Sequence, residues 1–137
     1  MTKVEFIVPG QPQGKGRAKV TTRNGWAHAY TPEKTTLYEN LIKLCFLETK
    51  SDKLQGAIKM TISAFYLIPK SFSKKKEQSA LLDEIKPLTK PDLDNIAKVV
   101  CDALNGVAYD DDKQIVEMCI NKYYSLNPKV IVEIAEV

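Results

Sequence analysis

The sequence predicts a single small domain of the α/β or α+β class over residues 1–137. A length of 137 residues suits one domain, and 44% hydrophobic with 27% charged residues is typical of a globular protein with one apolar core. Apolar positions repeat at every second residue in some segments and at helical spacing in others. Strands and helices are therefore both expected within this short chain.

The N-terminal part predicts a strand followed by a basic loop. Residues Lys3–Pro9 alternate between apolar and polar, as in a half-buried strand that ends at Pro9–Gly10. Residues 10–32 contain four glycines, four basic side chains and no acidic one. Within them, Asn24–Gly25 is typical of the turn of a short hairpin. We expect this segment to be a flexible, positively charged loop.

The middle of the chain predicts two helices with a strand between them. A helix from about Pro32 to Lys50 would have Thr31 as its N-cap. Its apolar positions at helical spacing are Leu37, Leu41, Ile42, Leu44 and Phe46. The β-branched and aromatic residues of 57–68 favour a strand, and Ser73 can cap a helix that extends to about residue 85.

The C-terminal part predicts a further helix and two strands. Asp92 or Asp94 can open the helix, and Asn105–Gly106 is a good C-terminal stop. Strands are expected over Gln114–Tyr124 and Pro128–Val137. No linker divides the chain, so all these elements belong to one domain.

The net charge of +3 conceals an asymmetry. Residues 1–90 carry 16 basic and 8 acidic side chains, whereas residues 91–137 carry 4 basic and 9 acidic ones. Attraction of a polyanion depends on where charge lies, so the near-neutral total does not exclude nucleic-acid binding. Scattered surface charge is the structural alternative.

The sequence also disfavours several classes of protein. Cys45, Cys101 and Cys119 form no CxxC pair and are odd in number, which disfavours a disulfide framework or a structural zinc site. We expect them to be buried in a reducing compartment. The single His28 leaves one candidate base for a nucleophilic triad. No apolar run approaches the roughly 20 residues that span a bilayer, and no signal peptide is evident, so we expect a cytoplasmic protein.

Carboxylates gather between residues 92 and 112. Asp92 and Asp94 stand at the entrance of the predicted helix, where a turning backbone lets both carboxylates converge. Asp94, Lys98 and Asp102 follow at four-residue intervals and share one helix face. Asp110–Asp112 then precede the next strand. Like charges so close together are unfavourable unless a cation or a proton compensates them.

Oxygen ligands without His or Cys suit Mg²⁺ or Mn²⁺. Such an ion would activate water for attack on a phosphodiester, while Lys98 neutralises the charge that develops on phosphate. The structural alternatives make Asp92 or Asp94 an N-cap, Lys98 an ion-pair partner of Asp94, and the three consecutive aspartates a solvated turn. A calcium EF-hand is excluded because Ala97 and Ala103 occupy the positions that require Gly and Glu.

The segment KPDLDNIAKVVCDALNG, followed by YDDDKQI, resembles the RusA family of crossover junction endodeoxyribonucleases, the Holliday junction resolvases common in bacteria and their prophages. The resemblance extends to VPGQPQGKGRAK with YTP and to IPKSFSKKK, so it covers most of the chain. The matching core, D-x-D-N-x-x-K-x-x-x-D-A-L followed by D-D-x-Q, is specific because it combines several fixed spacings. It implies a small mixed α/β fold that forms a homodimer, binds four-way DNA junctions and cuts two strands symmetrically with Mg²⁺ or Mn²⁺.

The resemblance also assigns roles by position. Asp92, Asp94 and Asp112 match the metal-binding catalytic aspartates, and Lys98 matches the catalytic lysine. Aligning on D-D-x-Q selects Asp111 and Asp112, with Asp112 in the essential place and Asp110 as an extra carboxylate. The residues expected to contact DNA are Gln13, Gly14, Lys15, Gly16, Arg17, Lys74, Lys75, Lys76, Lys90 and Asn95.

The leading hypothesis is thus a dimeric, metal-dependent endonuclease that resolves Holliday junctions by phosphodiester hydrolysis, with no small-molecule cofactor and no membrane partner. Two alternatives stay open. One is a non-catalytic, structure-selective DNA-binding protein whose carboxylates only cap helices. The other is a general metal-dependent nuclease.

Overall fold

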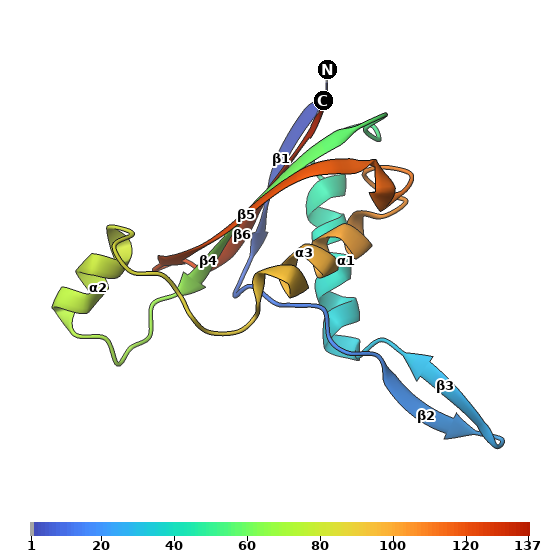
Figure 1. Ribbon diagram of the computed structural model, residues 1–137, viewed down its shortest axis with the longest axis horizontal. Helices are drawn as coiled ribbons and strands as arrows, with labels where there is room; N and C mark the ends of the chain where they lie inside the picture. Colours follow the sequence, from blue (N-terminus) through green and yellow to red (C-terminus); the bar gives the residue numbers. More distant parts are fainter. Residues whose placement is uncertain (1) are drawn as a thin grey trace.

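A four-stranded mixed sheet forms the centre of the fold, in the order β1-β6-β4-β5 (Figure 1). Strands β1 (Lys3–Pro9) and β4 (Ile58–Leu67) both pair antiparallel with β6 (Lys129–Glu136), and β5 (Ile115–Ser125) pairs parallel with β4. The computed structural model describes residues 2–137 and, at Arg23, the backbone alone. The mixed sheet with its helices confirms the expected fold class and all four of these predicted strands.

Helices α1 (Glu33–Leu47) and α3 (Leu93–Leu104) cover one face of the sheet (Figure 1). Alternate residues of β1, β4 and β6 are buried beneath them, so the period of two seen in the sequence is confirmed. The buried side of α3 is formed by Ile96, Val99, Val100, Ala103 and Leu104. Apolar packing along its whole length therefore holds the helix that carries the candidate site.

Helix α1 differs from expectation in its N-cap, its end and its buried side. Pro32 is the N-cap in place of Thr31, and the helix ends three residues earlier than predicted. Leu37 and Leu44 are 62% and 57% exposed. The buried residues are Thr35, Tyr38, Ile42 and Phe46. The segment has more than one apolar stripe, and a helix lying on a sheet buries only one.

Helix α2 (Lys74–Leu81) begins as predicted but is shorter. Ser73 is its N-cap and accepts a hydrogen bond from the Lys76 backbone N–H at 3.2 Å. Asp83, with φ of +62°, lies outside the helical region and keeps the helix from reaching residue 85. Leu82 consequently stays exposed.

Strands β2 (Lys19–Arg23) and β3 (Trp26–Tyr30) form a separate hairpin. Its turn is the predicted one, with φ of +52° at Asn24 and +78° at Gly25. A 3₁₀ helix, η1 (Asp112–Gln114), precedes β5.

All three cysteines are free, as expected, but only two of them are sheltered. Cys45 and Cys101 are partly buried, and burial raises the pKa of both thiols, to about 11 for Cys101. Cys119 is exposed, contrary to expectation, because it lies on β5 opposite Thr61, on the face of the sheet that points away from the core. No helix within residues 2–137 is long and apolar enough to cross a bilayer.

Candidate active site

The N-terminal end of α3 presents two exposed carboxylates. Asp92 occupies the N-cap position with extended backbone, yet its side chain makes no capping hydrogen bond. Asp94 lies in the first turn, and Lys98 one turn further on. Within residues 2–137 the ion pairs include neither aspartate nor Lys98, although an Asp94–Lys98 pair was one structural explanation for these residues. An N-cap hydrogen bond and an ion pair along the helix therefore do not account for Asp92, Asp94 and Lys98.

Tyr66 of β4 holds the backbone just before Asp92. Its hydroxyl donates a hydrogen bond to the Pro91 carbonyl at 2.6 Å. Burial, together with the nearby Asp92 charge, raises the pKa of Tyr66 to about 12, so the hydroxyl stays a donor. The sequence reveals no such role for Tyr66, because a buried strand tyrosine normally indicates only core packing.

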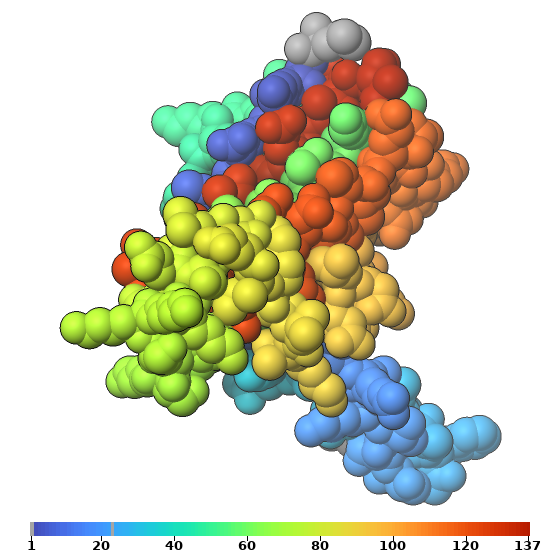
Figure 2. All heavy atoms as spheres, turned by 60° about the vertical axis from the view of Figure 1, so that its left-hand side comes forward, coloured from blue at the N-terminus to red at the C-terminus, as the bar shows by residue number. Residues whose placement is uncertain are grey.

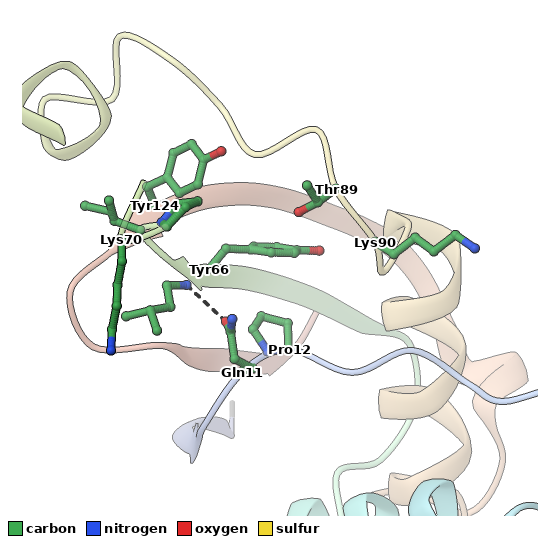
Figure 3. Close-up of a pocket in the computed structure, with 10 residues that line it drawn as sticks. Gln11, Pro12, Tyr66, Lys70, Thr89, Lys90 and Tyr124 are labelled. Carbon is green, nitrogen blue, oxygen red and sulfur yellow. Dashed lines mark hydrogen bonds between the residues drawn. The ribbon is translucent and has the colours of Figure 1, made fainter. Parts of the chain in front are cut away.

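A cleft of about 300 Å³ lies between this tyrosine and Thr89 and Lys90, in the segment that precedes α3 (Figure 3). Figure 3 shows the Tyr66 ring between Thr89 and Pro12, with Tyr124 and Lys70 at the other end. Lys70 and Lys90 give the lining two positive charges and no carboxylate. An anionic ligand would suit such a cleft, and Asp92 directly follows the Lys90–Pro91 segment at its edge.

Two of the three consecutive aspartates that follow α3 have structural partners. Asp110 forms an ion pair with Lys53 at 3.1 Å. Asp111 caps η1 by accepting from the Lys113 backbone N–H at 2.9 Å, and Gln114 completes a capping box. That backbone hydrogen bond lowers the pKa of Asp111. Both side chains thus have structural partners.

Asp112 has an exposed carboxylate with no cation beside it. Its backbone N–H donates to Asn105 Oδ1 at 3.0 Å, which places it at the C-terminal end of α3. Desolvation, the hydrogen bond with the Asp111 side chain and the charges of Asp111 and Asp102 raise the pKa of Asp112. The neighbouring negative charges therefore disfavour its ionised form. Of the two aspartates in the D-D-x-Q motif, Asp111 caps η1, whereas Asp112 belongs to none of the ion pairs of residues 2–137.

Asp92 and Asp112 flank opposite ends of α3. The helix has 12 residues, and at about 1.5 Å of rise per residue its ends lie about 18 Å apart. Within residues 2–137, no group of three or more Asp, Glu, His or Cys side chains is arranged to hold a metal ion. One chain therefore does not bring the three aspartates to a single cation, and the assignment of these metal ligands stays a prediction.

The glycine-rich loop, residues 13–17, is held against α1 and α3. The Lys15 backbone N–H donates to the Asn95 carbonyl at 3.1 Å, and that of Gly16 donates to Thr35 Oγ1 at 3.0 Å. A Cβ on Gly14 would lie 2.8 Å from the Asn95 Cβ. These glycines permit close packing, a role that sequence reasoning missed when it predicted a flexible loop.

Two of the predicted DNA contacts in this loop differ in their surroundings. Lys15 Nζ lies 2.9 Å from Glu39 Oε2 and 3.2 Å from Asp102 Oδ2. Its charge is therefore already compensated within the chain. Arg17 is exposed and belongs to none of the ion pairs of residues 2–137. The loop can thus bind an anion more readily through Arg17 than through Lys15.

The predicted basic cluster of α2 is exposed. Lys74, Lys75 and Lys76 occupy the first turn of this helix. Lysines also lie over aromatic rings, in the pairs Lys76–Phe72, Lys86–Tyr123, Lys122–Tyr66 and Lys129–Phe65. These pairs join residues from separate elements, so no sequence spacing could have revealed most of them. This end of the molecule combines positive charge with aromatic surface.

Comparison with known proteins shows the family to which the chain belongs. Residues 9–135 match the protein family described as Endodeoxyribonuclease RusA. The chain is also 36% identical over 140 residues to a Bacillus subtilis (strain 168) protein named "Uncharacterized protein YqaN", with 100% of this chain and 99% of that protein covered. Because the match spans nearly the whole domain, including both ends of α3, the chain belongs to the RusA family of endodeoxyribonucleases.

Proposed function

We propose that this protein is a homodimeric, Mg²⁺- or Mn²⁺-dependent endonuclease that resolves four-way DNA junctions by paired, symmetric hydrolysis of phosphodiesters. The observation that carries the proposal is the Asp92, Asp94 and Lys98 group, which has no structural partner within residues 2–137. Membership of an endodeoxyribonuclease family supports the reaction class. The products would carry 5′-phosphate and 3′-hydroxyl ends, with no covalent enzyme intermediate.

The donor chemistry of Asp92 and Asp94 fits a hard divalent cation. Mg²⁺ is commonly held by one or two carboxylates and by substrate phosphate. When bound, the cation would supply water activation and charge neutralisation at the phosphate. Lys98, exposed on the next turn, would stabilise the negative charge that develops on the phosphate oxygens. Tyr66 would keep the turn before Asp92 in place.

Asp112 would complete the site from a second chain. Its distance along α3 prevents it from meeting Asp92 in the same chain, as the helix length requires. In a symmetric dimer, the Asp112 end of one α3 can approach the Asp92 end of the other, and two equivalent sites arise. Two sites related by a twofold axis suit symmetric cleavage of two strands.

DNA would be held by exposed basic residues around this region. Arg17, Lys90 and the Lys74–Lys76 turn are all exposed, and none lies in an ion pair within residues 2–137. Lysine and arginine contacts to phosphates release counterions, so junction binding is expected to weaken steeply with salt. Such contacts position the substrate without reading its sequence.

Mixing two inactive variants tests the shared site. Asp92→Asn and Asp112→Asn proteins are each expected to lose Mg²⁺-dependent cleavage of a synthetic junction. In a mixed dimer, the two substitutions fall in one composite site and leave the other intact. Co-refolded variants should therefore recover single-strand nicking. Asp110→Asn, whose side chain pairs with Lys53, is the matched control and should stay active.

The outcomes separate the parts of this proposal. Undiminished cleavage by Asp92→Asn protein would contradict the catalytic assignment. No recovery on mixing, with dimers shown to exchange chains, would place each site within one chain. Equal cleavage of junction, flap and linear duplex would indicate a general nuclease in place of a resolvase.

A non-catalytic DNA-binding protein is the second candidate. It is favoured by one observation, the lack of a three-ligand metal group within residues 2–137 of one chain. This candidate predicts junction binding without cleavage and no rise in thermal midpoint when Mn²⁺ is added. A real metal site would stabilise the folded protein by mass action.

A further inference from the structure

The β2–β3 hairpin projects from the rest of the molecule (Figures 1 and 2). Its strands join no strand of the main sheet. Every side chain described in it is exposed, and Trp26 is 73% exposed. A two-stranded hairpin is at best marginally stable alone in water. Contact between its exposed aromatic side chains and a ligand would therefore stabilise this hairpin.

The pairing register separates the hairpin into two unlike faces. Cross-strand partners share a face, and successive residues alternate between faces. The pairs Lys19–Tyr30 and Thr21–His28 therefore lie on the same face as Trp26. We call this the stacking face, and it comprises Lys19, Thr21, Trp26, His28 and Tyr30. The opposite face carries Val20, Thr22, Ala27 and Ala29.

The chemistry of the stacking face fits nucleic acid. It combines a lysine with Trp26, Tyr30 and the His28 ring, and residues 10–32 contain no carboxylate that could neutralise it. A hollow of about 510 Å³ on the hairpin is lined by Thr21, His28 and Tyr30 of this face and by Thr22 of the opposite one. Aromatic rings beside basic side chains are the features by which proteins bind exposed bases and their phosphates.

We propose that the stacking face binds DNA bases that are unpaired or unstacked, with Trp26 stacking on a base and Lys19 contacting a phosphate. The inference rests on the proposed junction-resolving function, because a branch point exposes base faces that a continuous duplex hides. Apolar or aromatic side chains can enter such a step once the bases there separate. The hairpin would thereby distinguish a junction from a linear duplex.

Trp26 is the only tryptophan of the chain, so its fluorescence reports on this arm alone. In EDTA, to prevent cleavage, the full-length protein would be titrated with a four-way junction, a single strand and a linear duplex. The junction and the single strand should quench Trp26 emission more strongly than the duplex. Anisotropy of dye-labelled DNA, followed in parallel, would measure binding itself.

Variants on the two faces make the test specific. Trp26→Ala should weaken junction binding about 5- to 150-fold, the effect of losing one stacked base, with an unchanged salt dependence. Lys19→Ala should instead lower the slope of log K against log salt by about one. Val20→Ala, at a position that is 69% exposed on the opposite face, is the matched control and should bind normally.

The possible failures can be told apart. Junction binding without quenching, and without an effect of Trp26→Ala, would overturn the hairpin inference and leave the proposed function intact. Quenching by single strands without junction binding would contradict the proposed function and support a base-binding arm. Trp26 emission that changes with protein concentration alone, together with a lower molecular mass of Trp26→Ala, would assign the face to a second copy of the chain and overturn the inference.

Discussion

The Lys15 ammonium lies 3.2 Å from Asp102 Oδ2, and this ion pair ties the glycine-rich loop to α3. The same ammonium lies 2.9 Å from Glu39 on α1. Burial opposes the charged form, but the hydrogen bonds and charges of the two carboxylates prevail and raise the pKa of Lys15. One lysine therefore joins three segments around the candidate site.

Replacing this lysine should destabilise the fold. Lys15→Met leaves Glu39, whose side chain is 15% exposed, without its cation. Losing a hydrogen bond to a charged group costs roughly 1.5–3 kcal/mol, which urea unfolding at pH 7 would measure. Because the folded pKa is raised, the stabilisation is full below the unfolded value of about 10.4 and is lost as pH rises through the folded value. Lys34→Met, exposed at the start of α1, should change stability little.

Gly14→Ala should disturb the loop by steric overlap. The added Cβ would lie 2.8 Å from the Asn95 Cβ and 3.0 Å from the Pro91 Cβ, so the loop must move away from α3. Overpacking of this kind typically costs about 1–3 kcal/mol. Thermal unfolding would detect it. Arg17→Ala, at an exposed site in the same loop, should leave stability within about 0.5 kcal/mol, and equal effects of the two changes would contradict this explanation.

Tyr66→Phe should weaken the support of Asp92. The change removes the hydrogen bond to the Pro91 carbonyl, at an expected cost of about 0.5–1.5 kcal/mol. Junction cleavage should fall further than junction binding, because the displaced group belongs to the proposed catalytic end. Tyr124→Phe removes a hydroxyl from the same cleft and serves as the control. Similar losses of cleavage in both variants would show that Tyr66 has no specific positioning role.

The raised pKa of Asp112 predicts a pH-dependent effect of Asp112→Asn in EDTA. Desolvation, the hydrogen bond with Asp111 and the charges of Asp111 and Asp102 make the folded protein bind this proton more tightly than the unfolded chain does. Wild-type stability should therefore fall as pH rises from the ordinary carboxyl pKa near 4 through the raised value. The variant lacks that loss, so its thermal midpoint should exceed that of wild type at pH 7 but not at pH 3. A higher wild-type midpoint at pH 7 would show that Asp112 is held by a favourable contact.

Local patterns in the sequence were sufficient for most of the elements. Alternation predicted β1 and β4, and helical spacing with an N-cap predicted α2 and α3. Asn24–Gly25 predicted the hairpin turn because both residues tolerate positive φ. Such features depend on residues close in the chain, and so a single sequence reveals them.

The positions of the helices and of the candidate site residues in space depended on contacts between distant segments. Which side of α1 is buried was decided by the sheet, and Leu37 was left exposed. The sequence placed Asp92 and Asp112 in one acidic group, but the rigid length of α3 separates them. The resemblance already favoured Asp112 over Asp111, and the structure adds the capping bond that Asp111 accepts from the Lys113 backbone N–H. By itself the sequence thus determined the fold class, the family motif and the chemistry of its carboxylates, because these follow from local patterns. Only the tertiary structure decided that Asp110 is paired and that Asp92 and Asp112 lie apart, because these relationships depend on residues far away in the chain, such as Lys53, and on the length of a packed helix.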